Sequence, residues 1–332
     1  IKLKTFGSFT VGNDLTSVQE GAWRSEKLEK LFVYLAMNRN RGVCIEDISE
    51  AIWQVEEETD NPVGALKNLA YRLRKALRDA SFDEECIVSV RGGLYKWNDD
   101  VEVTIDVEEF DRYINEAEMA FCRSKETAIE SYEKAIALYH GDFLPLRTDT
   151  HWFMTLNAFY HSRYVNTVKA LAELYIDTGC YEKLEQLCTK AVVYERSDEQ
   201  IYSYLIVARM RTKKVQMAFD TYETAKAIMD KDLGVRKTVM LNKVYEELLS
   251  VTKGASSYNI DEVKDDISEE SMNGVFMCGY PVFKEIYHLE VRKSARSTVP
   301  ESLVLVTVVP MYSSQPDKNH SHMKDSMLIL GT

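Results

Sequence analysis

The chain has 332 residues, of which 45% are apolar and 28% carry a charge. At about 100 to 200 residues per domain, this length predicts two or three domains with real cores. The longest apolar run, residues 303–310, is far shorter than the roughly 20 residues that cross a bilayer, which argues against a membrane protein. We therefore expect a cytoplasmic protein that has no membrane partner.

Six cysteines are spread along the chain without a C-x-x-C pair or a Cys/His cluster at zinc spacing. This usage is typical of reduced thiols in a cytosol, so we expect neither a disulfide nor a structural metal. No Gly-rich phosphate loop and no ordered nucleophile triad stands out either. The sequence therefore predicts a protein that is not an enzyme and that uses no cofactor.

Three weaker candidates favour structural roles. His320 and His322 could hold a metal, but a polar loop without a third ligand favours a solvated pair. Cys180 and Cys188 are expected to be packed thiols rather than a redox switch. Aromatic residues at helical spacing usually belong to a core rather than a ligand groove, which applies to Trp152, Phe153, Phe159 and Tyr160.

The net charge of −12 argues against a nucleic-acid partner, because phosphate neutralisation requires a positive surface. Residues 61–78 are an exception, since they hold five basic side chains and no acidic one. Charge runs are usually solvated helix faces, but in so acidic a chain Glu–Lys pairs at i,i+4 would be the default. Composition alone leaves DNA binding and a solvated face open.

The first 100 residues contain short strands and three helices. Residues 1–20 alternate apolar and polar side chains between glycines, which predicts a small opening sheet. Apolar spacing over residues 28–36 predicts a helix whose first turn is capped by the Ser25 hydroxyl. Residues 45–53 predict a second, shorter helix.

The third helix has the clearest start signal, because Asn61 is a good N-cap and Pro62 suits the first helical position. Beyond it, residues 86–97 predict two strands joined by a Gly-Gly turn, which is a hairpin. The buried stripe expected for the third helix is Leu66, Leu69, Ala70, Leu73, Ala76 and Leu77.

These parts together make a winged helix-turn-helix. A helix can enter the major groove with donors for base edges and phosphates, and a hairpin can approach a neighbouring phosphate or minor groove. We therefore expect helix 61–78 in the major groove and hairpin 86–97 as the wing. The predicted DNA-binding residues are Lys67, Asn68, Tyr71, Arg72, Arg74, Lys75, Arg78, Arg91, Gly92, Gly93 and Lys96.

Residues 107–250 are helical in pattern, with breaks expected near Gly141, Gly179, Ser197 and Gly234. A small-large-small apolar stripe recurs in this region, and its members Cys188 and Tyr222 are 34 residues apart, the period of tetratricopeptide repeats. Any array of helical hairpins is the alternative interpretation. The stripe comprises Ala128, Tyr132 and Ala135, then Leu184, Cys188 and Ala191, then Ala218, Tyr222 and Ala225.

Residues 1–250 resemble the SARP-type transcriptional regulators, which join an OmpR-type winged helix to a bacterial transcriptional activator domain of tetratricopeptide-like helices. Residues 64–77 (GALKNLAYRLRKAL) look like the recognition helix, and residues 139–144 (YHGDFL) look like a turn of the second domain. Further matching segments are residues 3–11, 25–31, 48–53 and 90–97, with Trp152, Glu199 and residues 233–235. The resemblance implies an activator that binds direct-repeat DNA, with a homodimer and RNA polymerase as expected partners and with the helical domain for dimerisation or for the contact with polymerase.

The last part of the chain has a different composition. Residues 252–273 hold six acids against two lysines and predict a solvated linker. Residues 274–332 resemble the front half of a diguanylate-cyclase-like domain, but they lack its metal-binding carboxylate and its glycine turn. We interpret them as an incomplete or degenerate α/β module.

The expected fold class is therefore mainly α, a winged helix-turn-helix followed by a tetratricopeptide-like array and then a small α/β piece. The expected domains are residues 1–104, 105–251 and 274–332, with the linker between the last two. A sequence-specific transcriptional regulator is the predicted function. A non-enzymatic tetratricopeptide scaffold and a nucleotide-responsive sensor are the alternatives.

Overall fold

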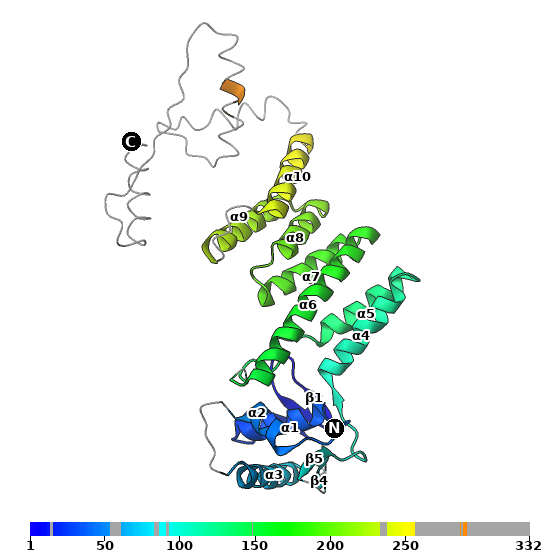
Figure 1. Ribbon diagram of the computed structural model, residues 1–332. Helices are drawn as coiled ribbons and strands as arrows, with labels where there is room; N and C mark the ends of the chain where they lie inside the picture. Colours follow the sequence, from blue (N-terminus) through cyan, green and yellow to red (C-terminus); the bar gives the residue numbers. More distant parts are fainter. Residues whose placement is uncertain are drawn as a thin grey trace, which may run out of the picture. The chain divides into compact units, whose positions relative to one another are not determined.

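The computed structural model describes residues 1–13, 16–53, 61–82, 86–90, 93–147, 149–232, 238–255, 286 and 288–290 (Figure 1). The chain divides into two compact units, residues 1–256 and 257–332, and nearly all described residues belong to the first. Most of the predicted linker and the predicted C-terminal module lie outside the described residues. Arg91, Gly92, His320 and His322 lie outside them as well.

A small sheet opens the chain, as predicted, and a fourth strand from further along the chain joins it. Its strands are β1 (Lys2–Lys4), β2 (Thr10–Gly12), β3 (Ser17–Gln19) and β6 (Thr104–Ile105), in the order β3-β2-β1-β6. The first three pair antiparallel, whereas β6 pairs parallel to β1 with Leu3 opposite Ile105. The sequence did not predict β6, because a two-residue strand has no periodicity of its own and pairs with a segment about 100 residues away.

The winged region follows, with α1 (Glu26–Met37), α2 (Ile45–Ile52), α3 (Pro62–Asp79), β4 (Ile87–Val90) and β5 (Leu94–Trp97). Two local predictions were wrong. Ser25 is the N-cap of α1, but its hydroxyl makes no capping bond, and only its carbonyl oxygen accepts from the amides of Leu28 and Glu29. Trp53 has extended backbone, so α2 ends one residue earlier than expected.

In the described part of the chain, the array consists of seven helices: α4 (Asp106–Ala120), α5 (Lys125–Leu138), α6 (His151–Thr178), α7 (Tyr181–Tyr194), α8 (Glu199–Arg211), α9 (Val215–Asp232) and α10 (Val239–Ala255). Successive helices pack side by side (Figure 1). The breaks predicted at Gly141, Gly179 and Ser197 fall in connections between helices, and Gly234 lies outside the described residues. The α4–α5 and α8–α9 connections were missed because no glycine or proline marks them, and α10 extends a few residues into the predicted linker.

The small-large-small stripe lies on α5, α7 and α9, and all nine of its side chains are buried. Leu171 of α6 and Leu205 of α8 are buried opposite them, which confirms the tetratricopeptide-like register. Glu199, at the start of α8, accepts hydrogen bonds from the amides of Met240 and Leu241 at 2.7 and 3.0 Å. This carboxylate therefore caps the first turn of α10.

The apolar core does not stop at the end of the winged region. One continuous cluster of buried side chains runs from Leu3 to Ala208, and a second one packs α8, α9 and α10 together. The predicted boundary after residue 104 falls within β6, whose partner is the first strand of the chain. The division into domains stays a prediction.

Replacing Ala225 with leucine should lower the free energy of unfolding by roughly 1–3 kcal/mol, because overpacking forces neighbouring helix backbones apart. Ala225 is 0% exposed in α9. Ala227, on the exposed face of the same helix, is the matched control, and Ala227→Leu should change the free energy little. Urea denaturation measures both, and equal effects would contradict the repeat register.

Candidate nucleic-acid interface

The structure confirms how α3 begins and which side of it packs. The Asn61 carboxamide oxygen accepts a hydrogen bond of 2.9 Å from the amide of Gly64, and Pro62 is at the first helical position. The predicted stripe is buried against α1 and α2, except that Ala76 is only half-buried. A helix anchored on one side in this way exposes its other side as a regular surface.

The exposed side of α3 carries most of the predicted DNA-binding residues. Lys67, Asn68, Arg72, Lys75 and Arg78 are all exposed. Tyr71 is 66% exposed, which is unusual for an aromatic side chain in a well-packed helix. Within the described residues, no hydrogen bond or ion pair engages the side chains of Lys67, Asn68, Tyr71, Arg72 and Lys75.

Arg74 differs from its neighbours in α3, because its guanidinium is directed at the wing. Its Nε and Nη2 atoms donate hydrogen bonds of 3.1 and 3.0 Å to the carbonyl oxygen of Ile87 in β4. Arg74 is half-buried, so it joins the helix to the hairpin instead of extending into solvent. Sequence periodicity cannot separate such a residue from an exposed arginine.

The wing contributes less than expected among the residues that are described. Gly93 has φ of +82°, a left-handed turn conformation that favours glycine. Lys96 forms an ion pair with Asp99, three residues along the chain. The hairpin is joined to the rest of the winged region through Val43, which forms an antiparallel bridge with Tyr95 of β5.

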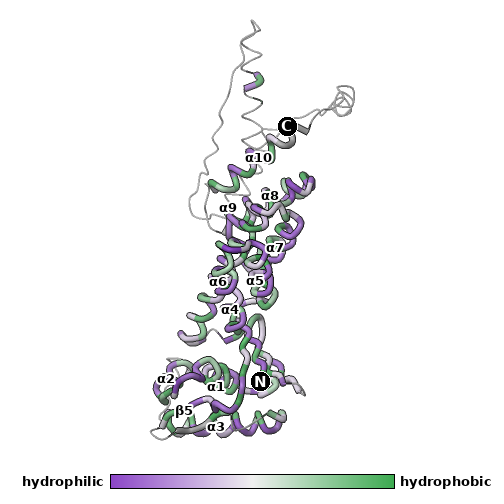
Figure 2. Tube along the Cα trace, turned by 90° about the vertical axis from the view of Figure 1, so that its right-hand side faces the viewer, coloured by the Kyte–Doolittle hydropathy of each residue, from purple (hydrophilic) through white to green (hydrophobic). Residues whose placement is uncertain are grey.

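The helical array contacts the winged region on the side away from α3. Figures 1 and 2 both show α3 at the far end of the winged region from α4 and α6, with α1 and α2 between them. The contacts with the array run through β1, α1 and α2. The exposed side of α3 is therefore not covered by the array.

Asp106, the first residue of α4, is the centre of a joint between the winged region and the array. Its carboxylate accepts hydrogen bonds from the amides of Thr5 and Phe6 at 2.7 and 2.9 Å, and from the Thr5 hydroxyl at 2.6 Å. A fourth bond comes from the amide of Val107. Burial raises the pKa of this carboxyl, and these four donors oppose that effect.

Two ion pairs, each with one almost completely buried partner, form a second part of the joint. The Lys30 ammonium of α1 pairs with Asp149, and the Arg147 guanidinium pairs with Glu29 of the same helix. Lys30 and Glu29 are each only 1% exposed. Beside them, Trp152 of α6 packs edge-on against Tyr34, with ring centroids 4.8 Å apart.

The turn at residues 139–144 completes the joint. Phe143 forms an isolated antiparallel β-bridge with Phe6, and the carbonyl oxygen of Asp142 accepts a hydrogen bond of 2.9 Å from the amide of Gly7. Gly7 has φ of +80°, and a side chain there would lie 2.6 Å from the carbonyl oxygen of His140. The YHGDFL segment thus forms the contact between the array and the opening sheet.

The His161 imidazole lies between the carboxylates of Asp142, in this turn, and Glu195. Its Nδ1 is 2.8 Å from the Asp142 carboxylate and its Nε2 is 3.1 Å from that of Glu195. Burial alone would lower the pKa of His161, but the two carboxylates outweigh burial and raise it. Nothing in the sequence pattern singles out this histidine, because both of its partners are distant along the chain.

The weaker candidates are mostly structural. Phe153 and Tyr160 are buried core residues as predicted, whereas Phe159 is 49% exposed. Cys180 is a half-buried free thiol and Cys188 a buried one, whose pKa is raised by burial. Across the residues that are described, there is neither a cluster of metal-binding side chains nor a helix that could span a membrane.

Comparison with known proteins agrees with this arrangement. Residues 20–97 match the family "Transcriptional regulatory protein, C terminal", and residues 105–249 match "Bacterial transcriptional activator domain". The transcriptional regulator RedD of Streptomyces coelicolor is 24% identical over 238 residues, which cover 71% of this chain and 67% of RedD.

Among solved structures, EmbR of Mycobacterium tuberculosis, in complex with a low-affinity phosphopeptide, has a TM-score of 0.58 and 20% identity. The match covers 80% of this chain and 70% of EmbR, and it supports the fold. None of these matches supports a diguanylate-cyclase-like remnant in residues 274–332.

Both family matches, in this order along the chain, describe regulators and not enzymes. The winged region, the tetratricopeptide-like array and the joint that residues 139–144 help to form between them all fit a regulator of this kind. This chain belongs to the SARP family of DNA-binding transcriptional regulators, in which an OmpR-type winged helix precedes a bacterial transcriptional activator domain.

Proposed function

We propose that this regulator is a sequence-specific activator in the cytoplasm that inserts α3 into the major groove of its operator. The observation that carries this proposal is that the exposed side of α3 holds basic side chains although the net charge of the chain is −12. Its donors at Lys67, Asn68, Tyr71, Arg72 and Lys75 have no partner among the described residues. Unpaired donors on an exposed helix are what base edges and phosphates require.

The residues of this surface divide by chemistry. Asn68 and Arg72 are four residues apart on one side of α3, and their side chains can pair bidentately with adenine and guanine. Phosphates suit the ammonium groups of Lys67 and Lys75 and the guanidinium group of Arg78. Arg74 positions the wing, which would contact the neighbouring backbone or minor groove through Arg91, Gly92, Gly93 and Lys96.

The second part of the proposal concerns the role of the helical array. One winged region offers about 600–1,000 Å² of DNA contact, which is small for tight specific binding. We propose that two copies bind a direct repeat, and that the array holds the pair or contacts RNA polymerase. The extent of its helical surface supports this role, since the contacts of the joint named above come from α4, α6 and the connection between α5 and α6, and none of them from α8, α9 or α10.

Arg72→Ala and Asn68→Ala should each weaken binding to a selected operator by about 1–3 kcal/mol and weaken binding to random DNA less. Fluorescence polarisation at two salt concentrations measures both affinities. Arg123→Ala is the matched control, because Arg123 is an exposed arginine in the α4–α5 connection, outside the proposed surface.

Equal losses on both DNAs would reassign Asn68 or Arg72 to a phosphate contact. Affinity that is indifferent to salt and to all substitutions in α3 would contradict DNA recognition by this helix. That result would favour the alternative of a tetratricopeptide scaffold.

A further inference from the structure

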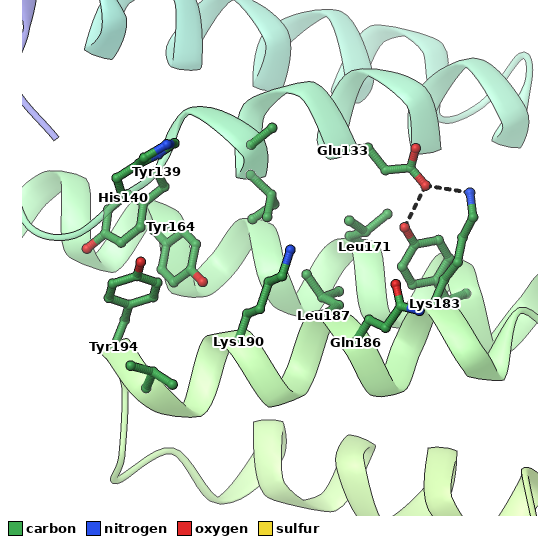
Figure 3. Close-up of a pocket in the computed structure, with 14 residues that line it drawn as sticks. Glu133, Tyr139, His140, Tyr164, Leu171, Lys183, Gln186, Leu187, Lys190 and Tyr194 are labelled. Carbon is green, nitrogen blue, oxygen red and sulfur yellow. Dashed lines mark hydrogen bonds and ion pairs between the residues drawn. The ribbon is translucent and has the colours of Figure 1, made fainter. Parts of the chain in front are cut away.

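The helical array contains a pocket whose lining residues all belong to the array. It lies between α5, α6 and α7, and its volume is about 720 Å³. Figure 3 shows Tyr139, His140, Tyr164 and Tyr194 at one end, Glu133 and Lys183 at the other, and Lys190 between them. A volume within about 300–1,000 Å³ is typical of sites for small organic molecules.

The end of the pocket at Glu133 is already satisfied by contacts within the protein. The Lys183 ammonium and the Tyr175 hydroxyl both donate to Oε1 of Glu133, at 2.8 and 2.7 Å. The charges at this end cancel. A ligand therefore gains no ionic contact there without breaking an existing pair.

The opposite end has donors without acceptors. Tyr164 is only 1% exposed, yet its hydroxyl has no hydrogen-bond partner among the described residues. Lys190 of α7 is an exposed side chain that has no partner in the described part of the chain, and Figure 3 shows its ammonium extending toward the same pocket. Among the described residues, the Tyr164 hydroxyl oxygen is not one of the fully buried atoms that lack a partner, so it reaches the open space of the pocket, where a ligand can accept its hydrogen bond.

Aromatic packing holds the Tyr164 ring in place. Tyr139 stacks on it with centroids 3.8 Å apart and 11° between planes. Tyr194 meets it edge-on at 5.8 Å. The hydroxyl is thus presented from a fixed ring, which lowers the entropy cost of binding an acceptor.

The wall between the two ends is apolar. Leu171 of α6 and Leu187 of α7 line it and are almost completely buried. An apolar wall beside one cation and one hydroxyl donor complements a molecule that has a single negative group on a hydrocarbon or aromatic body.

We propose that this pocket binds a small organic anion. A carboxylate on the ligand accepts hydrogen bonds from the Tyr164 hydroxyl and the Lys190 ammonium, and its apolar body lies against Leu171 and Leu187. The unpaired positive charge in a chain of net charge −12 supports an anion over a cation. This inference does not depend on the proposed mode of DNA binding.

The test uses the full chain without DNA and the fluorescent probe 8-anilinonaphthalene-1-sulfonate, which joins an anion to aromatic rings. Saturable binding is expected. Lys190→Glu should weaken it by about tenfold or more and Tyr164→Phe by about threefold to tenfold, since each removes a donor to an anion. Lys243→Glu, the same charge change at an exposed site on α10, should leave the affinity unchanged.

Displacement identifies the chemistry of the ligand. 1-Naphthoate should displace the probe at least about tenfold better than uncharged 1-naphthalenemethanol. Equal displacement by the two compounds, or equal probe affinity in all four proteins, would overturn the proposal. Displacement by an acidic peptide but not by 1-naphthoate would also overturn it, in favour of a peptide groove.

Thermal melting provides an independent readout. Because the Tyr164 hydroxyl has no partner among the described residues, Tyr164→Phe should leave the melting temperature unchanged or slightly raised. A clear fall in melting temperature would show that the hydroxyl is bonded within the protein, which would contradict the inference. None of these measurements involves DNA, so failure of the operator experiments would not affect them.

Discussion

Asp106→Ala is expected to lower the free energy of unfolding by roughly 3–5 kcal/mol, a loss near the upper end for a single substitution. The Asp106 carboxylate accepts from two amides and one hydroxyl of Thr5 and Phe6, and from the amide of Val107. Asp106 and Thr5 are both buried, so water cannot replace the lost acceptor. Several donors are left unsatisfied at once.

Urea denaturation of the full chain measures this effect. Asp106→Asn keeps one oxygen acceptor but turns an NH₂ group toward a donor, so its loss should be intermediate. Asp100→Ala removes an exposed carboxylate near the same region and should cost little. A loss for Asp106→Ala no larger than that for Asp100→Ala would mean that the joint does not stabilise the fold.

The second expected result concerns operator geometry and depends on the proposed pairing of two copies. A DNA carrying two half-sites about 10–11 base pairs apart should bind the regulator at least about 100-fold more tightly than a DNA with one half-site. At this spacing both half-sites face the same side of the duplex. The joint through Asp106 and the ion pairs of Lys30 and Arg147 fixes each α3 relative to its array.

Spacing variants provide the control for that prediction. Inserting about five base pairs turns the second half-site to the opposite side and should abolish the gain, while inserting about ten should restore part of it. Footprinting and fluorescence polarisation measure binding of the regulator to both spacing variants. One half-site bound as tightly as two, or a gain indifferent to the five-base-pair insertion, would contradict the paired arrangement.

Features that depend on neighbours in the chain were predictable from the sequence. The cap at Asn61, the buried stripe of α3 and the small-large-small stripe of the array all follow from helical spacing and local hydrogen bonds. The family resemblance rests on the same segments, so the local pattern of residues is enough to indicate both the winged helix and the activator domain.

Contacts between distant segments were decided only by the tertiary structure. Asp106 meets Thr5 across 101 residues, β6 pairs with β1, and Arg74 leaves the exposed side of α3 to bind the wing. Tyr164 is an ordinary core tyrosine in sequence, and its unpartnered hydroxyl becomes apparent only where α5, α6 and α7 meet. The sequence by itself determined which segments are helical and which of their sides are apolar, although not every break between helices, because those properties depend on residues within a few positions. The joint and the pocket required the fold, because a buried polar group is defined by the donors and acceptors that packing brings to it.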